Sequence, residues 1–85
     1  MNVKLTIREE RGEQMRDWLL NARRERGLTQ LDVAKKLDIS EAYFNYIENG
    51  ERQKKMDIAL ASKLSMILEI PLAEIIEFEK SEGRM

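Results

Sequence analysis

The sequence contains no cysteine and no histidine. The absence of cysteine excludes disulfide bonds, thiolate chemistry and cysteine-bound zinc. The absence of histidine removes the commonest general base and the commonest metal ligand of proteins. Proline occurs once and glycine four times, a composition that favours helices over a fold rich in β-turns. We therefore expect a helical chain that holds no metal and no cofactor.

Long apolar runs are missing too. The longest extend over only a few residues, far fewer than the ~20 that a membrane-spanning helix needs. The first residues, Met1 to Thr6, contain no continuous apolar stretch of the kind found in a signal peptide. The sequence thus predicts a cytoplasmic protein that does not engage a membrane.

The chain has 85 residues, of which 42 % are hydrophobic and 36 % charged, enough for one globular core and too apolar for a disordered chain. The formal net charge is −1, which by itself argues against a nucleic-acid partner. Many of the basic residues are clustered, however, and their position matters more than the sum. They form two groups: Arg23, Arg24, Arg26, Lys35 and Lys36, and then Arg52, Lys54 and Lys55. For either group alone, a solvated helix face or loop is the simpler interpretation.

Three helices are expected in the first half of the chain. The first covers residues 13–26, and Gly27 supplies a left-handed stop after it. The next two begin after Thr29 and Ser40, which are good N-cap residues. Residues at helical spacing face the core. They are Met15, Leu19 and Ala22 in the first helix, Val33, Ala34 and Leu37 in the second, and Phe44 and Ile47 in the third.

Two more helices follow a polar, basic loop at residues 51–56. Asp57 is expected to cap the fourth helix, and Pro71 suits the first position of the fifth. Their apolar faces consist of Ile58, Ala61, Leu64, Ile67 and Leu68, and then of Leu72, Ile75 and Ile76. The predicted fold class is therefore all-α, a compact arrangement of five helices with short connections.

The chain divides into a helical domain at residues 13–80 and two short ends. Residues 1–12 form either an arm or an extension of the first helix. Residues 3–8 alternate between apolar and polar, as in a strand, whereas residues 6–9 match a helix capping box. The tail, residues 81–85, is expected to be frayed.

The second and third helices are joined by a tight turn. Two short helices joined in this way, with a small residue where they cross, form a helix-turn-helix. Ala34 is that small residue, and Asp38 stands where the turn needs a left-handed backbone, which Asp tolerates better than most residues. A generic helical bundle shows the same apolar spacing, so periodicity alone does not establish DNA binding.

The same region carries a long, order-specific string of residues. It consists of Gly27-Leu28-Thr29-Gln30, Ala34, Ile39-Ser40 and Ile47-Glu48-Asn49-Gly50, and continues through Leu64, Leu68, Leu72 and Ile75. At this spacing the string resembles the Cro/phage-repressor (XRE-type) helix-turn-helix family of transcriptional regulators, over about residues 15–79. The resemblance implies a lambda-repressor-like, sequence-specific DNA-binding domain from a bacterium or phage. It also implies a repressor that acts as a homodimer on palindromic, double-stranded operator DNA.

The resemblance assigns roles to individual residues. The third helix would enter the major groove, with four base-contacting residues: Glu41, Ala42, Asn45 and Tyr46. Asparagine can pair bidentately with adenine, glutamate can accept from cytosine N4, and alanine can touch a thymine methyl group. The residues expected to contact phosphates are Gln30, Ser40, Tyr43, Asn49, Arg52, Lys54 and Lys55. Free N–H groups at the start of the second helix would assist Gln30.

Two structural roles follow from the same resemblance. Arg23 and Glu48 match a partly buried ion pair that fixes the third helix on the first. Dimer contacts are expected from the fifth helix, although the residues concerned could instead complete the core: Leu72, Ile75, Ile76 and Phe78. The two half-sites of the operator would lie about one helical turn, roughly 34 Å, apart.

The sequence departs from the family pattern at several positions. Lys54 and Lys55 stand where members commonly have a proline and a serine cap, and the cap Asp57 comes later, so the loop is longer. Glu69 replaces a common glycine, which should be mildly destabilising. Leu31 is apolar at a usually polar position.

A protein-binding helix-turn-helix, such as an antitoxin or an anti-repressor partner, is the alternative hypothesis. Leu31, Tyr43, Tyr46 and the weak net charge favour it. An enzyme is not expected, because the acidic residues are spread over helix faces, no serine has a histidine partner, and no glycine-rich loop is present to cradle a phosphate. We therefore expect no small-molecule substrate.

Overall fold

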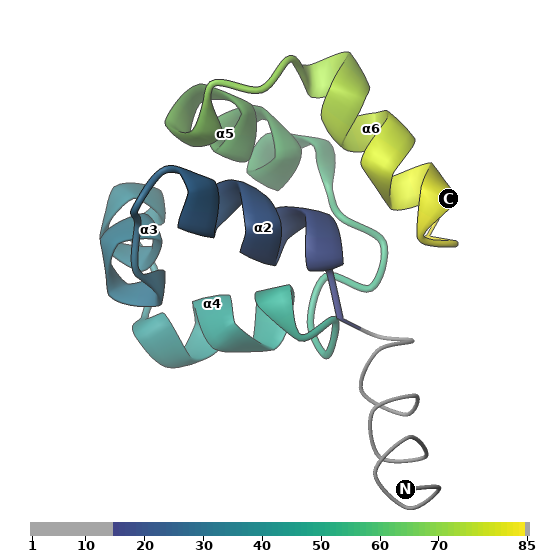
Figure 1. Ribbon diagram of the computed structural model, residues 1–85. Helices are drawn as coiled ribbons and strands as arrows, with labels where there is room; N and C mark the ends of the chain where they lie inside the picture. The colour runs from purple at the N-terminus through teal and green to yellow at the C-terminus, as the bar shows by residue number, and fades with distance from the viewer. Residues whose placement is uncertain (1–14, 85) are drawn as a thin grey trace, which may run out of the picture.

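The structure, a computed structural model, describes residues 15–84. Over this range it contains five α-helices and no strand (Figure 1): α2 (Asp17–Glu25), α3 (Gln30–Leu37), α4 (Glu41–Glu48), α5 (Ile58–Leu68) and α6 (Leu72–Ser81). The all-α prediction is confirmed for this part of the chain. The hypotheses for residues 1–12 lie outside the described residues. No helix between residues 15 and 84 has the length and apolar content needed to cross a bilayer.

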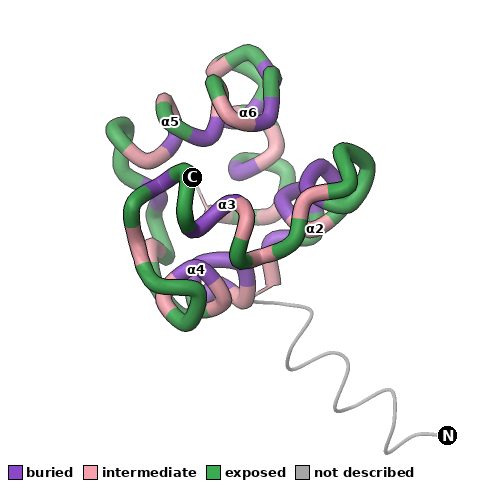
Figure 2. Tube along the Cα trace, turned by 90° about the vertical axis from the view of Figure 1, so that its left-hand side faces the viewer, coloured by how far each residue is buried: buried purple, intermediate pink, exposed green. Residues whose placement is uncertain are grey.

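Helix α2 runs through the middle of the fold, with α4 on one side of it and α5 and α6 on the other (Figure 1). Helix α3 packs against both α4 and α5, and α5 packs against α6. In Figure 2 the buried stretches of the helices face the interior and the exposed stretches face outward. The core consists of Trp18, Leu19, Ala22, Val33, Ala34, Leu37, Phe44, Ile47, Met56, Ala61, Leu64, Leu68, Ile70 and Ile75. The pair α3–α4 is thus supported from behind by the other helices.

Three helices begin at the N-caps predicted from the sequence. The hydroxyl of Thr29 accepts a hydrogen bond from the N–H of Asp32 at 3.0 Å, and the Asp32 carboxylate accepts one from the N–H of Thr29 at 2.8 Å. This reciprocal pair is a capping box at the start of α3. Ser40 caps α4 and Asp57 caps α5 in the simpler way, each accepting one backbone N–H. These bonds satisfy N–H groups that have no partner within the helix.

The turns after the helices use left-handed backbone where the sequence predicts it. Gly27 has φ 66° after α2, and Asp38 has φ 60° at the end of α3. Glu69 adopts φ 57° at the end of α5, a conformation in which glycine would avoid the steric cost of a Cβ atom. The tight turn at Asp38 brings α4 directly across α3.

The structure corrects the predicted apolar face of α5. Ile58 was expected to be buried but is 64 % exposed. It is the first residue of α5, and Met56, just before the cap Asp57, enters the core in its place. Met56 and Ala61 stand at the N′ and N4 positions, which commonly pack together as a hydrophobic staple. The apolar face therefore starts before the helix rather than at its first residue.

The ends of several elements also differ from the predictions. Helix α2 begins at Asp17, later than expected, and Pro71 is the N-cap of α6 rather than its first residue. At the other end of the described chain, Arg84 is bonded to α6. The N–H of Arg84 donates to the carbonyl of Glu79 at 2.8 Å, and its guanidinium lies 3.3 Å from the Glu79 carboxylate. These bonds fold the end of the described chain back onto α6.

Candidate nucleic-acid interface

Helix α4 buries one side and exposes the other. Phe44 and Ile47 are fully buried and fix the helix to the core. The opposite side carries the four predicted base-contacting residues. Glu41, Ala42 and Tyr46 are exposed, and Asn45 is half-buried. The helix is therefore held rigidly from behind while a mostly polar side faces outward.

Most of the residues predicted to contact phosphates lie at the starts of α3 and α4 or after the end of α4. Gln30 is the first residue of α3, and Ser40 is the cap of α4. Tyr43 lies within α4. The half-buried C-cap Asn49 follows the helix, and after it come three exposed cations, Arg52, Lys54 and Lys55. An anion on either side of α4 would meet a helix start or a cation.

Arg23 and Glu48 form an ion pair that joins α2 to the end of α4. Nε and Nη2 of Arg23 donate to the two oxygens of Glu48 at 2.8 and 3.0 Å. Nη1 of Arg23 also donates to the carbonyl of Leu28 at 3.0 Å. A bidentate pair of this kind fixes the orientation of both side chains.

A chain of side-chain amides extends from this pair toward the outward side of α4. Nε2 of Gln30 donates to Glu48 at 2.8 Å, and Oε1 of Gln30 accepts from Asn45 at 3.3 Å. Oδ1 of Asn45 in turn accepts from Asn49 at 3.1 Å. Each amide carries two N–H donors and two acceptor lone pairs, so these bonds leave Asn45 further donor and acceptor capacity. The chain aligns three of the predicted DNA-contacting residues with one another.

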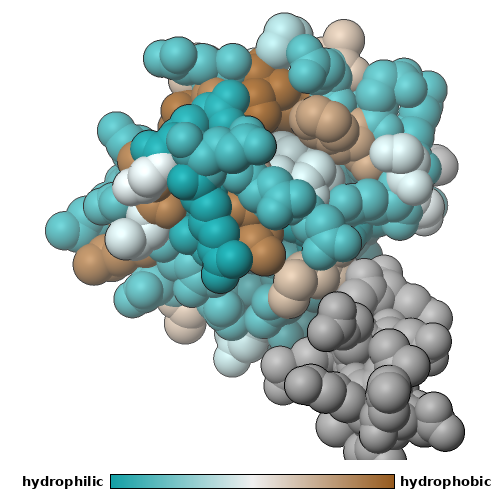
Figure 3. Space-filling view, viewed as in Figure 1, coloured by the Kyte–Doolittle hydropathy of each residue, from teal (hydrophilic) through white to brown (hydrophobic). Residues whose placement is uncertain are grey.

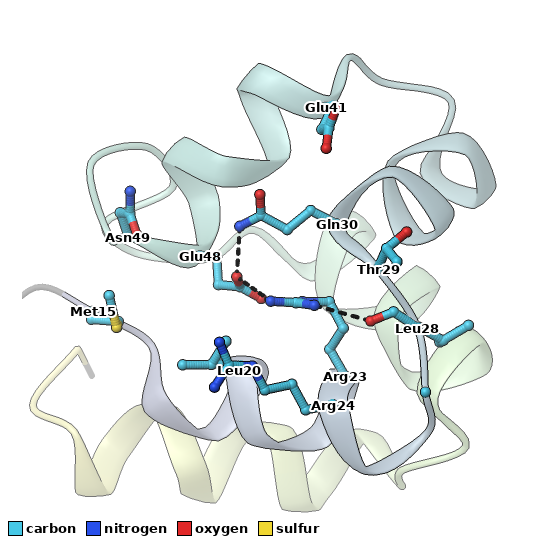
Figure 4. Close-up of a pocket in the computed structure, with 11 residues that line it drawn as sticks. Met15, Leu20, Arg23, Arg24, Leu28, Thr29, Gln30, Glu41, Glu48 and Asn49 are labelled. Carbon is cyan, nitrogen blue, oxygen red and sulfur yellow. Dashed lines mark hydrogen bonds and ion pairs between the residues drawn. The ribbon is translucent and has the colours of Figure 1, made fainter.

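Gln30, Glu48 and Asn49 line an open hollow of about 600 Å³ between α2, α3 and α4 (Figure 4). Figure 4 shows Gln30 crossing from α3 to the Glu48 carboxylate, which lies beside the guanidinium of Arg23. Arg24 and Glu41 also line the hollow. Its lining thus combines charged groups of both signs with the apolar side chains of Met15, Leu20 and Leu28.

The basic loop, residues 51–56, is fixed to α4 at its start. The N–H groups of Glu51 and Arg52 donate to the carbonyl of Tyr46 at 2.8 and 3.2 Å. The guanidinium carbon of Arg52 lies 5.5 Å from the centre of the Tyr46 ring, within range of a cation–π contact. Gln53 has φ 55°, which is uncommon for a residue other than glycine.

Arg16, to which the sequence patterns above assign no role, has a fully buried side chain. It forms an ion pair of 2.9 Å with Glu79 of α6, which is also fully buried. A signal was present in the sequence. Arg16, Leu19 and Arg23 follow helical spacing, and this spacing places both arginines on the side of the first helix that faces the core.

Tyr43 and three of the residues proposed for dimer contacts pack partly or fully into the subunit. Tyr43 is half-buried against the core, beside Ile39. Ile75 is fully buried, so of its two expected roles it completes the core, and its side chain is not available to contact a second subunit. Phe78 stacks on Trp18 with ring centres 5.4 Å apart, and Leu72 packs against the core. The fourth residue, Ile76, is half-buried.

The carboxyl group of Asp32 has a lowered pKa. The main cause is the hydrogen bond from the backbone N–H of Thr29, followed by the bond with the Thr29 hydroxyl. Lys35 and Lys36 act in the same direction through their charge. The start of α3, next to Gln30, therefore keeps an ionised carboxylate over a wider pH range than a free aspartate would.

Comparisons with known proteins agree with this geometry. Residues 19–75, which include all of α3, α4 and α5, match the sequence model of a family described as helix-turn-helix. An uncharacterized HTH-type transcriptional regulator of Bacillus subtilis, YqaF, is 44 % identical over 45 residues. The matched stretch covers 53 % of this chain and 59 % of that relative, less than two thirds of its length. No solved structure matches the chain.

Proposed function

The chain belongs to the Cro/phage-repressor (XRE-type) helix-turn-helix family, and we propose on this basis that it is a sequence-specific DNA-binding transcription regulator of the cytoplasm. The observation that carries the proposal is the two-sidedness of α4. Its inner residues Phe44 and Ile47 are 0 % exposed, whereas Glu41, Ala42 and Tyr46 face solvent. A helix held in this way can enter a major groove without losing its own packing. By occupying the operator it would exclude other proteins, and so act as a repressor.

Base recognition is assigned to the outward side of α4. Asn45 would pair with the N6 and N7 groups of adenine, and its amide is already oriented by Gln30 and Asn49. Glu41, in the first turn, would accept from cytosine N4, and Ala42 would contact a thymine methyl group. Tyr46 would lie at the far end of the same side, where its ring also supports a loop cation.

Phosphate contacts are assigned to both flanks of α4. Gln30 and Ser40 would bind one strand, together with backbone N–H groups at the helix starts. The exposed cations of the basic loop and Asn49 would bind the other: Arg52, Lys54 and Lys55. Tyr43 is the weakest of the proposed contacts, because half of its side chain packs on the core.

The proposed assembly is a homodimer on a palindromic operator. Because Ile75 is core, the contact surface would use the outer side of α6 at Ile76, with Met66 of α5, which is 80 % exposed. In Figure 3, apolar surface gathers where α5 and α6 lie, above a largely hydrophilic face. The proposal requires the two α4 helices of such a dimer to lie about one DNA turn, roughly 34 Å, apart.

One observation favours the protein-binding alternative. Leu31 and Tyr46 are 43 % and 42 % exposed, so apolar surface accompanies the polar side of the α3–α4 pair. An antitoxin or an anti-repressor partner would use such surface against a protein. The affinity for a protein partner would depend weakly on salt. The affinity for DNA would fall with salt, and the slope of log K against log salt would be about 0.9 per phosphate contact.

The test is selection of bound duplexes from a random DNA pool, followed by a salt titration of the selected sequence. We expect a two-fold symmetric consensus and a slope that corresponds to several phosphates. Binding without any sequence preference, or with no dependence on salt, would contradict the proposal.

A further inference from the structure

Arg16, immediately before α2, donates only to groups inside the protein. Nη1 donates to the carbonyls of Ile47 at 2.7 Å and Arg52 at 3.3 Å, and Nη2 donates to the carbonyl of Gln53. Nε and Nη2 also donate to the carboxylate of Glu79, so all five N–H donors of the guanidinium are engaged. Because Ile47 belongs to α4 and the next two carbonyls to the basic loop, one side chain joins the end of α4 to the loop that follows.

The loop that Arg16 holds has an unfavourable backbone. Gln53 adopts a left-handed φ of 55° and is held from two sides. Its carbonyl accepts from Arg16, and its side-chain oxygen accepts from the N–H of Asp57 at 3.0 Å. Residues in such conformations persist where the surrounding structure fixes them, often at functional sites. The loop conformation therefore depends on these contacts.

Glu79 of α6 sets the direction of the Arg16 side chain. Its two carboxylate oxygens accept from Nε at 2.9 Å and from Nη2 at 3.1 Å. Nε1 of Trp18 donates to the same carboxylate at 2.7 Å. A bidentate pair fixes the plane of a guanidinium, so its remaining donors point at the loop. Helix α6 lies across the fold from α4 (Figure 1), yet through Arg16 it constrains the segment next to α4.

We propose that Arg16, oriented by Glu79, is a positioning residue for the phosphate contacts of the basic loop. This inference rests on the proposed function. The pair keeps the loop backbone in the conformation that presents Arg52, Lys54 and Lys55 together beside the end of α4. Arg16 is 0 % exposed and does not touch DNA; it acts through the loop carbonyls. A pair that served folding alone would alter stability without altering the number of phosphates bound.

The first test uses the full chain without DNA. Trypsin cleaves after lysine and arginine, and the basic loop contains three such residues. We expect cleavage in the loop to be several-fold faster in Glu79→Gln than in the wild type, at a temperature at which circular dichroism shows both folded. The double variant Arg16→Met/Glu79→Met, which keeps the core filled with apolar groups, should behave in the same way. Unchanged cleavage in both variants would overturn the inference.

The second test measures binding to the selected duplex over a range of salt concentrations. The slope of log K against log salt corresponds to about 0.9 per phosphate contact. By this measure both variants should lose about one to two phosphate contacts. Their affinity for every duplex should fall by the same factor, and the base preference should not change. The control is Leu64→Ala, which removes buried atoms of α5 and should lower stability while leaving the slope unchanged.

The outcomes separate the two proposals. If the wild type selects no DNA sequence, the proposed function fails, and the role of Arg16 in DNA binding fails with it. If the wild type binds its duplex and the two variants keep the wild-type slope, the inference alone is overturned. A lowered slope in Leu64→Ala would also overturn it, because the slope would then follow stability rather than the loop.

Discussion

The guanidinium of Arg23 and the carboxylate of Glu48 meet edge to edge, with 2.8 and 3.0 Å between their paired nitrogen and oxygen atoms. The two side chains are 10 % and 3 % exposed. The pair ties α2 to the last turn of α4, and Glu48 also holds Gln30 at the start of α3. The orientation of α4 therefore depends on a buried charge pair as well as on apolar packing.

Replacing one partner of this pair should be costly. Arg23→Met leaves the Glu48 carboxylate buried without its cation, and we expect a loss of roughly 3–5 kcal/mol in the free energy of unfolding, measured by urea denaturation. The control is Glu77→Gln, which breaks a 3.7 Å ion pair with Lys80. In this pair the side chain of Glu77 is 72 % exposed and that of Lys80 is 57 % exposed. That change should cost no more than about 1 kcal/mol. Equal losses in the two variants would show that the buried pair has no special weight.

Asn45→Ala should relax DNA specificity at one or two base pairs. The side chain lies on the outward side of α4 and supplies the donor and acceptor that adenine requires. Discrimination at those base pairs should fall by about 1–3 kcal/mol, measured with duplexes substituted at single positions. If affinity falls equally for every sequence, the assignment of Asn45 to base recognition is wrong.

Lys55→Ala should weaken binding to all sequences alike. Lys55 is exposed in the basic loop and is assigned to a phosphate. Its removal should reduce the salt slope by about 0.9, the contribution of one contact, with the base preference unchanged. A changed consensus in the selected DNA would contradict this role.

The capping box of α3 should make the free energy of unfolding depend on pH in the acidic range. The folded-state pKa of Asp32 is lowered, chiefly by the Thr29 N–H, so its stabilising contribution is present above the unfolded-state pKa, about 4. This contribution is lost as the pH falls through the lower, folded-state pKa. Asp32→Asn should therefore be less stable than the wild type at pH 7, and the difference should shrink below about pH 4 in urea titrations. Parallel stability curves for the two proteins would contradict the expectation.

Glu69→Gly should stabilise the protein. Glu69 has φ 57°, a conformation that costs an L-residue roughly 1–2 kcal/mol and glycine much less, partly offset by the greater freedom of glycine in the unfolded chain. We expect the free energy of unfolding, measured by thermal denaturation, to rise by up to about 1 kcal/mol. The converse control is Gly27→Ala at φ 66°, where an added Cβ meets no atom within 4 Å. Any loss of stability in this variant would therefore come from the strained backbone conformation alone. A destabilised Glu69→Gly would show that the Glu69 side chain contributes more than its conformation costs.

The local features of the fold were predictable because their causes are local. A helix cap needs a hydroxyl or carboxylate next to the first turn, and Thr29, Ser40 and Asp57 all serve as predicted. The left-handed turn at Asp38 follows in the same way from the short connection between two helices. The family match follows from the order of these features along the chain.

What the sequence did not reveal depends on distant partners. Arg16 and Glu79 are 63 residues apart, and although helical spacing places Arg16 on the core side of the first helix, it does not identify Glu79 as its partner. Periodicity also failed at Ile58, because a helix start can expose its first residue when the preceding one, Met56, fills the core. Ile75 carried two open interpretations, surface or core, which only the packing of α6 against α5 could separate.

The environment of Trp18 makes the protein its own optical probe. It is the single tryptophan of the chain and is 7 % exposed. Its indole stacks on the Phe78 ring and donates from Nε1 to the Glu79 carboxylate of α6. Release of α6 from α2 would move this buried indole into water. Its fluorescence would then shift to longer wavelength, so the emission spectrum of the unlabelled protein follows the attachment of its last helix.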